Sequence, residues 1–450
     1  MNEPTSLRHS AKEVALDTGL LAPADIERII QAVEARFDEQ IEFLTQLVRA
    51  DSLRGNEAGV QKIISAALAS RGYDVRSFAI DPARIGVDPA FSPTKFDLKD
   101  SSVVVGLKPA SGEGGRSLAL NAHVDVVPVG TSARWKYAPF SATRDGDWLY
   151  GRGAGDMKAG LAANLFALDA LATAGLDLLG EVQFQSVIEE EITGNGSAMV
   201  LAEGFRADAV LIPEPTGEQV VSANTGIMKF TITVQGVPAH PFQVAKGRSA
   251  IDIAFRTIEH LRQLEQEWIE ERPSDFADVD NPIALTIGTI SGGEWIASVP
   301  SECRFEGRIG FYPGDKAETR VESFESFLRK AFLNDPELEG CPEPYIEWLG
   351  AKQGGYVLAE GSEAELLLAK AHSFADGSGT ELQRFIMPCY LDSAVFALHG
   401  NMTSLVYGPV AENIHATDER VSIPSLLRVT KTIALFAAAW CGVKHRVEQG

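Results

Sequence analysis

Histidines and carboxylates stand at five separate places in this sequence, each beside an apolar run or a helical stretch. The first is the run LALNAHVDVV, which contains His123 and Asp125. Side chains two residues apart in an extended strand point to the same side. A carboxylate placed there can fix the tautomer and orientation of a metal-bound histidine. Taken alone, an H-x-D pair is more often an incidental polar strand end.

Asp156 stands in GRGAGDMKAG, immediately before a predicted long helix. The glycines resemble a G-x-G-x-x-G phosphate loop, but its sixth position is Asp156, and an anion there would repel a pyrophosphate. A nucleotide site is therefore disfavoured. An isolated aspartate at a helix start can also serve only as a cap.

Carboxylates and a histidine follow three further apolar runs. Glu189, Glu190 and Glu191 come after EVQFQSVI, Glu214 stands between two prolines in LIPEPTG, and His415 lies in the polar loop GPVAENIHATDE. Three adjacent carboxylates repel one another, so within a site they need cations to stay ionised. The prolines fix the backbone on either side of Glu214.

Together these segments offer two imidazoles and three carboxylates at predicted strand-to-loop junctions: His123, Asp156, Glu191, Glu214 and His415. This mixture suits Zn²⁺ or a similar divalent ion. With a carboxylate bridge, two ions about 3.5 to 4 Å apart can share a hydroxide and polarise a substrate carbonyl. Coincidence is the weaker explanation, and the sequence predicts a two-metal site.

The elements that position these residues alternate between strands and helices. Between Ser101 and Pro215, four short apolar runs alternate with helical stretches such as MKAGLAANLFALDALATAG. This order is typical of a mostly parallel sheet covered by helices, whose functional groups gather beyond the carboxyl ends of the strands. The same alternation of apolar runs and helical stretches returns after Gly350. Residues 24–50 are expected to form one amphipathic helix, preceded by a loose extension of twenty residues.

Residues 225–349 have a different pattern of apolar and polar residues. KFTITVQG alternates polar and apolar residues, and the segments after it suggest a β-α-β-β-α-β order. That order suits a compact α+β unit with one solvated sheet face. We expect an α/β catalytic domain of residues 1–224 and 350–450, with helices on both faces of a mixed, mostly parallel sheet, interrupted by an inserted α+β domain of residues 225–349.

Five motifs in this order resemble those of the M20 metallopeptidase family, which includes acetylornithine deacetylase, succinyl-diaminopimelate desuccinylase, aminoacylase and the glutamate carboxypeptidases. They are LNAHVDVVP, GRGAGDMKAG, IEEEITGNG, IPEPTG and GPVAENIHATDE, within residues 95–435. The resemblance implies a zinc-exopeptidase-like fold, a lid or dimerisation domain, and two divalent ions, most simply Zn²⁺ with Co²⁺ or Mn²⁺ as alternatives.

The resemblance also implies a role for each residue. The implied metal ligands are Asp156 between the ions, His123 and Glu214 on one ion, and Glu191 and His415 on the other. Asp125 would orient His123, and Glu190 would be the general base that takes a proton from the bridging water. Glu189 would be the acidic residue that precedes the Glu-Glu pair in the family. A shift of one residue along the three glutamates would move the roles of general base and metal ligand to other residues.

In the inserted segment, VQGVPAHPFQVAKGRSA resembles the lid motif of the family. The resemblance implies that His240 binds substrate, often in the partner subunit of a dimer, whereas the residues alone suggest a turn histidine between prolines. Gly310 occupies the place of a common lid arginine, and Arg308 stands two residues earlier. Arg308 is therefore the candidate for binding a substrate carboxylate. A homodimer through the lid is implied as well.

Charge and composition narrow the partners and the location. The 450 residues include 62 acidic and 40 basic side chains, a formal charge of −22, which disfavours nucleic acid and anionic membrane surfaces. No secretory signal is visible, the apolar stretch 433–443 is shorter than the roughly 20 residues that span a bilayer, and the four cysteines form no C-x-x-C pair. We expect a cytoplasmic enzyme with a small-molecule substrate.

The leading hypothesis is a metal-dependent amide hydrolase that removes an acetyl, formyl or similar acyl group from an N-acylated amino acid or related small amine, as acetylornithine deacetylase does. A dipeptidase or carboxypeptidase with the same site is the alternative. A catalytically inactive binding homologue is a third possibility, against which the intact set of ligands argues. The sequence leaves the substrate open.

Overall fold

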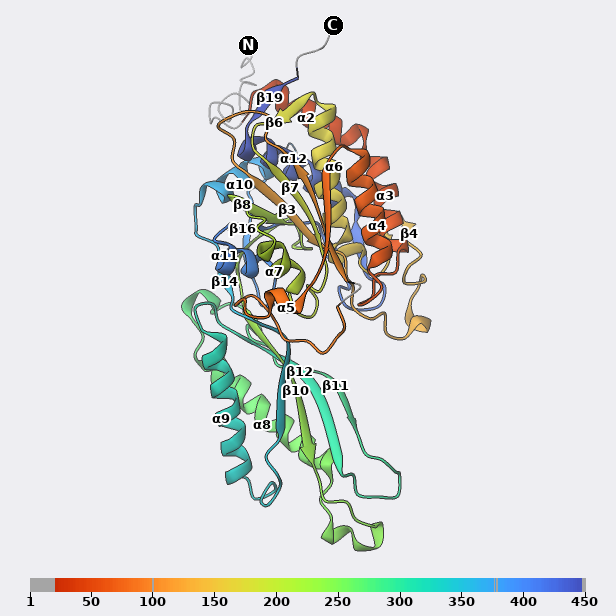
Figure 1. The fold of residues 1–450 in the computed structure, drawn as a ribbon, viewed down its shortest axis with the longest axis vertical. Coiled ribbons are helices and arrows are strands. Elements are labelled where there is room, and N and C mark those ends of the chain that lie inside the picture. The colour runs from red at the N-terminus through yellow and green to blue at the C-terminus, as the bar shows by residue number, and fades with distance from the viewer. Residues whose placement is uncertain (1–20, 99–100, 376, 378, 447–450) are drawn as a thin grey trace, which may run out of the picture.

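The structure is a computed structural model that describes residues 21–98, 101–375, 377 and 379–446. Figure 1 shows a body of helices around a central sheet, from which a narrower unit of helices and long strands extends. Buried apolar side chains form two clusters, a large one in the body and a smaller one in the extension. The predicted N-terminal extension lies outside the described residues.

The central sheet of the body has six strands in the order β1 (Asp74–Ala79), β2 (Ser102–Lys108), β7 (Val182–Val187), β3 (Leu118–His123), β8 (Ala209–Ile212) and β16 (Thr403–Val406). The last four run parallel, and β1 and β2 are antiparallel to their neighbours. Every residue of β3 and β7 is buried, so helices or loops cover both faces there. The expected mixed, mostly parallel sheet is confirmed.

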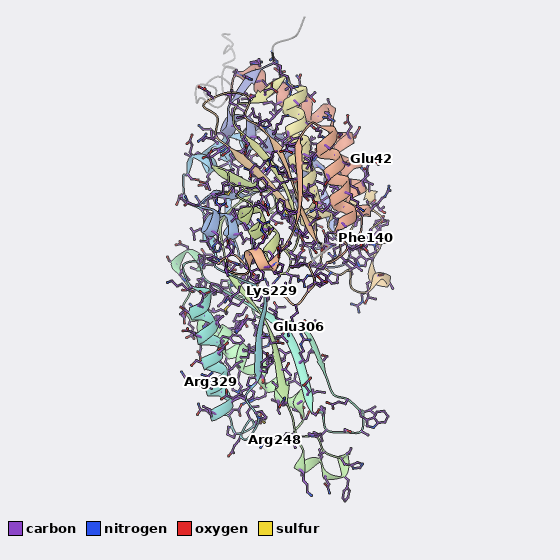
Figure 2. All side chains as sticks on the ribbon, viewed as in Figure 1. Glu42, Phe140, Lys229, Arg248, Glu306 and Arg329 are labelled. Carbon is purple, nitrogen blue, oxygen red and sulfur yellow. The ribbon has the colours of Figure 1, made fainter. Side chains whose placement is uncertain are left out.

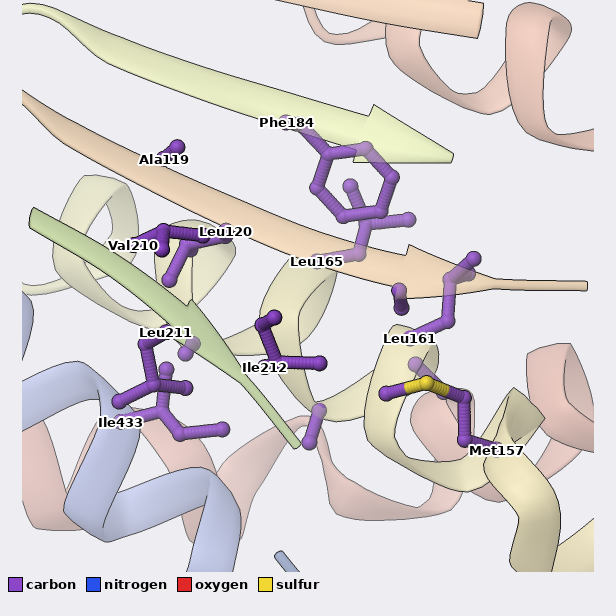
Figure 3. Packing of buried hydrophobic residues seen from close by; sticks show 14 of the residues in the cluster. Ala119, Leu120, Met157, Leu161, Leu165, Phe184, Val210, Leu211, Ile212 and Ile433 are labelled. Atoms are coloured by element: carbon purple, nitrogen blue, oxygen red, sulfur yellow. The ribbon is translucent and has the colours of Figure 1, made fainter. Parts of the chain in front are cut away.

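Helices of the body pack in groups around this sheet. The first group is α2 (Pro23–Ala35), α3 (Phe37–Arg49), α6 (Ala159–Thr173), α10 (Glu363–Ala375) and α12 (Ile423–Cys441). A second group is α7 (Asn195–Ala202) with α11 (Ser393–Gly400). Almost every residue of α6 is buried, and Figure 3 shows its Leu161 and Leu165 among the side chains of the sheet.

One close approach fixes the start of α6 against the end of β8. A Cβ atom added to Gly160 would lie 2.1 Å from the carbonyl oxygen of Pro213, so no larger side chain fits there. Because Pro213 precedes Glu214, this contact sets the distance between the helix start and that carboxylate.

The extension, which we call the lid, contains a four-stranded antiparallel sheet in the order β11 (Thr286–Gly292), β12 (Glu302–Phe311), β10 (Gly226–Gln235) and β13 (Tyr345–Gln353). Helices α8 (Ala250–Glu270) and α9 (Ala317–Asn334) pack against it and share its apolar core. The chain order of these elements is the predicted β-α-β-β-α-β. β13 continues to Gln353, across the predicted domain boundary at residue 350.

The remaining elements complete the described chain. They are α4 (Ala58–Ser70), α5 (Pro82–Ile85), a π-helical turn (Ala154–Lys158), three 3-10 turns (Ser132–Arg134, Pro241–Lys246, Ser274–Phe276), and the strands β4 (Thr143–Asp145), β5 (Trp148–Tyr150), β6 (Leu176–Leu178), β9 (Val220–Asn224), β14 (Tyr356–Val357), β15 (Arg384–Met387), β17 (Ala411–Glu412), β18 (Arg420–Ser422) and β19 (Val443–His445). All four cysteines are free. Among the described residues, no helix has the length and apolar character needed to cross a membrane.

The single helix predicted over residues 24–50 is wrong. The structure has two helices there, α2 and α3, separated at Arg36, whose φ of −111° and ψ of 9° leave the helical region. The Arg36 guanidinium forms ion pairs with Glu39 and with Asp169 of α6. Both helices pack their apolar sides on α6, so the apolar period continues across the break and hides it in the sequence.

Candidate metal centre

The carboxyl ends of the parallel strands deliver the predicted ligands to one edge of the sheet. His123 is the last residue of β3, Glu191 follows β7, and Glu214 comes two residues after β8. Asp156 stands in the turn before α6, and His415 lies in the loop between β17 and β18. Figure 3 shows β3, marked by Ala119 and Leu120, running towards the turn that holds Met157, the neighbour of Asp156.

Asp156 lies between the two histidines and presents one carboxylate oxygen to each. Its Oδ1 is 3.0 Å from His123 Nε2, and its Oδ2 is 3.3 Å from His415 Nε2. A second carboxylate approaches the same nitrogen of each imidazole: Glu214 Oε1 is 3.9 Å from His123 Nε2, and Glu191 Oε2 is 3.1 Å from His415 Nε2. The structure therefore brings all five candidate ligands together.

These donors fit a pair of divalent cations. Ligand atoms of His123, Asp156 and Glu191 lie within 4.8 Å of one another. Glu214 Oε1 is buried and accepts no hydrogen bond from any described residue. A buried carboxylate oxygen without a partner is costly unless a cation or a proton satisfies it. Two imidazoles with three carboxylates are the ligands that zinc and similar ions take in hydrolase sites.

Asp125 connects the segments of two candidate ligands. The Nδ1 atom of His123 lies 3.0 Å from the backbone oxygen of Asp125 and 3.5 Å from its carboxylate. The other carboxylate oxygen accepts a hydrogen bond from the backbone N–H of Glu191 at 3.2 Å. These contacts fix the His123 ring so that its Nε2 faces Asp156.

The three adjacent glutamates go to three different places. Glu189 has a left-handed backbone conformation with a φ of 71°, and its carboxylate forms a two-point ion pair with Arg54 at 2.5 and 2.7 Å. Glu190 lines the cavity described below, and Glu191 reaches His415. Glu189 is therefore held outside the cluster.

Burial and charge shift the acid–base properties of the cluster. Burial raises the pKa values of Glu190 and Glu214 well above their usual range, against the pull of the His123 charge. Burial alone would also raise the pKa of Asp156, but hydrogen bonds with His123 and His415 lower it. Hydrogen bonds with Asp156 and Glu191 raise the pKa of His415 to about 10. The crowded carboxylates thus stabilise a positive charge among them, either on an imidazole or on a bound cation.

A cavity of about 500 Å³ opens beside the cluster, and both the body and the lid line it. Asp156, Glu190, Glu191 and Glu214 form the acidic wall, and the lid contributes residues that include Lys229 and Arg308. A cavity of this size holds a small organic molecule.

The lid wall of the cavity carries two cations side by side. Lys229 and Arg308 are directly paired across β10 and β12. Lys229 Nζ donates a hydrogen bond of 2.6 Å to the backbone oxygen of Glu191, and Figure 2 places Lys229 where the lid meets the body. Within the described ranges, Arg308 forms no hydrogen bond or ion pair. Lys229 was not predicted from the sequence, where it stands as one lysine in the apolar strand start GIMKF.

His240 does not reach the cavity of its own chain. Its exposed ring precedes the 3-10 turn Pro241–Lys246, and its Nδ1 accepts the backbone N–H of Phe242 at 3.1 Å. The strand bridge between Val237 and Arg248 holds this turn, and Figure 2 shows Arg248 towards the far end of the lid. Among the described residues, the His240 ring therefore forms a hydrogen bond within its own turn and stands outside the cavity lining.

A mostly parallel sheet with paired imidazoles and carboxylates at its strand ends, and a lid over the adjoining cavity, define a metal-dependent hydrolase. The comparisons agree. The chain belongs to peptidase family M20/M25/M40, whose model matches residues 119–439. The expected family, its fold class and a metal-dependent amide hydrolase activity are thereby confirmed.

Curated relatives and solved structures match over most of their length. The chain is 31% identical over 365 residues to the N-formyl-4-amino-5-aminomethyl-2-methylpyrimidine deformylase of Halalkalibacterium halodurans, covering 77% of this chain and 84% of that protein. It is 24% identical to the succinyl-diaminopimelate desuccinylase of Dinoroseobacter shibae, covering 86% of this chain and 95% of that protein. The dipeptidase Dug1p of Saccharomyces cerevisiae shares the fold, with a TM-score of 0.76 at 14% identity over 93% of this chain and 99% of its own.

Proposed function

We propose that this protein hydrolyses the amide bond of a small N-acylated amino acid or related amine at a centre of two zinc ions. The observation that carries the proposal is Asp156, whose two carboxylate oxygens face His123 and His415, with Glu190 lining the cavity beside it. In this proposal Asp156 bridges the ions, His123 and Glu214 hold one of them, and Glu191 and His415 hold the other. Co²⁺ and Mn²⁺ are the alternatives to zinc.

Glu190 is the proposed general base. Divalent ions bound at the centre would acidify water, polarise the substrate carbonyl and stabilise the oxyanion. Glu190 takes a proton from the attacking water and donates it to the leaving amine nitrogen. Burial supports this role because it raises the pKa of Glu190, which opposes the lowering that nearby cations cause. Asp125 holds the His123 ring, as its contacts with the ring indicate.

Lys229 and Arg308 support a substrate that carries an anionic group. The two cations face the cavity, and Arg308 has no protein partner in the described ranges, so a carboxylate of the substrate is the natural counterion. N-acyl amino acids and dipeptides both carry one. A dipeptidase therefore remains the second candidate, and a substrate without a carboxylate, such as the formylated pyrimidine of the relative, fits this wall less well.

We also propose that the protein is a homodimer through the lid and works in the cytoplasm. The edge strand β11 supports the dimer because nearly all its residues are exposed and one of its sides is unpaired. Exposed apolar side chains of the lid include Trp295 and Ile296, which follow β11 in the chain, and Phe242 and Val244 in the turn after His240. His240 would then serve the cavity of the other subunit. Four free cysteines suit a reducing compartment.

A substrate panel with controlled metal content tests the proposed activity. Protein stripped with a chelator is reloaded with Zn²⁺, Co²⁺ or Mn²⁺ and assayed with N-acetyl, N-formyl and N-succinyl amino acids, dipeptides and an N-formylated aminopyrimidine. We expect two ions per chain and turnover of one carboxylate-bearing class. Fewer than one ion per chain, together with inactivity on every substrate after reloading, would contradict the proposal.

A further inference from the structure

A buried ion pair lies behind the candidate metal centre and takes no part in the proposed chemistry. Arg152 and Glu419 are 2% and 1% exposed, and Arg152 Nη1 is 2.5 Å from Glu419 Oε2. Removing two charges from water is costly, so a buried ion pair is weak evidence of stabilisation. Its hydrogen bonds indicate what else the pair does.

Glu419 holds the backbone of the turn that carries Asp156. Its Oε1 atom accepts the backbone N–H groups of Gly155 at 3.0 Å and of Asp156 at 3.1 Å. Asp156 has non-helical dihedral angles, φ −113° and ψ 97°, just before α6 begins. Because these two amides bond to a side chain, the carboxylate fixes the direction of the Asp156 peptide and thus of its side chain.

The turn fits closely against its surroundings at the same point. A Cβ atom added to Gly155 would lie 2.6 Å from the Cβ of Ala411 and 3.6 Å from Glu419 Oε1. Only glycine fits beside Ala411 at this point, so the close packing helps to hold the turn where Glu419 bonds to it.

Arg152 connects the same ion pair to two other segments of the centre. Its Nη2 atom donates hydrogen bonds to the backbone oxygens of Pro128 at 3.3 Å and Ala416 at 3.2 Å. Pro128 lies in the loop that follows Asp125, and Ala416 is the neighbour of His415. One buried guanidinium therefore joins the segments that carry ligands on both sides of Asp156.

We propose that the Arg152–Glu419 ion pair is a positioning element of the metal centre. It fixes the Asp156 turn so that one carboxylate oxygen faces His123 and the other faces His415. The inference rests on the proposed two-metal site. It predicts that loss of the ion pair lowers the affinity for metal by more than the loss of folding stability alone would explain. Neither residue touches the substrate or the reacting atoms.

Three changes separate positioning from stability. Glu419→Gln removes the charge that pairs with Arg152. The double change Arg152→Met with Glu419→Met removes both charges and fills the space with apolar atoms, a replacement that often restores stability. The control is Asp169→Asn, which weakens the ion pairs of another buried carboxylate, with Arg36 and Arg71, towards the opposite end of α6. For each variant, the free energy of unfolding is measured on metal-free protein and the zinc affinity by calorimetry.

We expect Glu419→Gln and the double Met variant to bind zinc about tenfold or more weakly, as is typical when a residue that orients ligands is changed. Asp169→Asn should keep the wild-type affinity although it loses stability. If the double Met variant or Glu419→Gln binds zinc with wild-type affinity while the wild type holds two ions, the positioning role is wrong and the proposed function stands. If the wild type itself binds no divalent ion, the proposed metal site fails and this inference fails with it.

Discussion

Glu190 and Glu191 are adjacent in the sequence, yet they meet different neighbours because successive side chains diverge. Both glutamates line the cavity and burial raises the pKa of Glu190, whereas Glu191 also lies within hydrogen-bond distance of His415. The same divergence directs Glu189 to an ion pair with Arg54, outside the cluster. Three identical residues can therefore take three separate roles.

Changing the proposed base should stop turnover and leave the metal in place. Glu190→Gln keeps the shape of the side chain but cannot accept a proton, and we expect kcat to fall by about 10² to 10⁴. Steady-state kinetics and metal analysis check this outcome. Amide hydrolysis by the variant at the wild-type rate would show that Glu190 is not the general base.

Removing a cation from the lid wall should weaken binding more than catalysis. For a carboxylate-bearing substrate, Arg308→Ala should raise KM by about tenfold or more, because a charged hydrogen bond contributes roughly 1.5–3 kcal/mol. The kcat should change little. A matched neutral substrate analogue is the control, and an equal rise of KM for both substrates would exclude charge recognition by Arg308.

Glu57 gives the stability of the protein a predictable pH dependence. Burial raises its pKa to about 7, with smaller contributions from the charges of Asp125 and Glu189. Its folded form therefore holds a proton more tightly than the unfolded chain, and its stabilising effect is lost as the pH rises from about 4.3, the unfolded pKa, through 7. Gln at this position can still accept the N–H of Gly55 but carries no charge. The free energy of unfolding of Glu57→Gln relative to the wild type should therefore be about 2 kcal/mol higher at pH 8 than at pH 5. Urea unfolding of the metal-free protein at both pH values checks this. An equal effect at both would contradict it.

Candidate ligands were predictable from the sequence because each stands in a recognisable string at a strand end. Lys229 and Arg54 were not, because their importance depends on contacts between segments far apart in the chain. Lys229 reaches the backbone of Glu191 from the lid, and Arg54 reaches Glu189 from a turn before α4. No local pattern around either residue specifies its partner.

Among the elements, strands that are buried on both faces were the easiest to predict. β3 is mostly apolar (LALNAH) because every residue of it is buried, whereas β7 (VQFQSV) was recognisable by its alternation of apolar and polar residues, although every residue of it is buried as well. The break between α2 and α3 could not be predicted from periodicity, because both helices present their apolar sides to α6. Apolar spacing reports which side of a segment is buried, and it does not report whether the segment is continuous.

The contact between α6 and the end of β8 should be sensitive to one methyl group. Gly160→Ala places a Cβ 2.1 Å from the Pro213 oxygen, so the helix start must move away from Glu214. We expect a loss of about 1–3 kcal/mol in the free energy of unfolding together with weaker zinc binding. Gly59→Ala in α4 is the control, because its Cβ meets nothing within 4 Å, and that change should be neutral or stabilising. Chemical denaturation and calorimetry compare the two. Equal stability of both variants would mean that the close approach imposes no constraint.

At the scale of the whole molecule, the lid presents an edge that a second copy could pair with. Dimerisation should depend on the apolar group near β11, so Trp295→Asp with Ile296→Asp should yield monomers. Light scattering of the wild type and the variant gives the molecular mass in solution. A monomeric wild type would refute the dimer and leave His240 without access to a cavity.

The sheet order has a consequence for biosynthesis. The edge strand β16 pairs with β8, and α12 packs on α2 and α6, so the last part of the described chain closes a core begun by the first helices. His415 and Glu419 lie in this last part. A nascent chain that lacks it holds His123, Asp156, Glu191 and Glu214 without the second imidazole and without the acceptor of the Asp156 amide. With the proposed ligands, complete metal loading is therefore expected only after synthesis of the C-terminal segment.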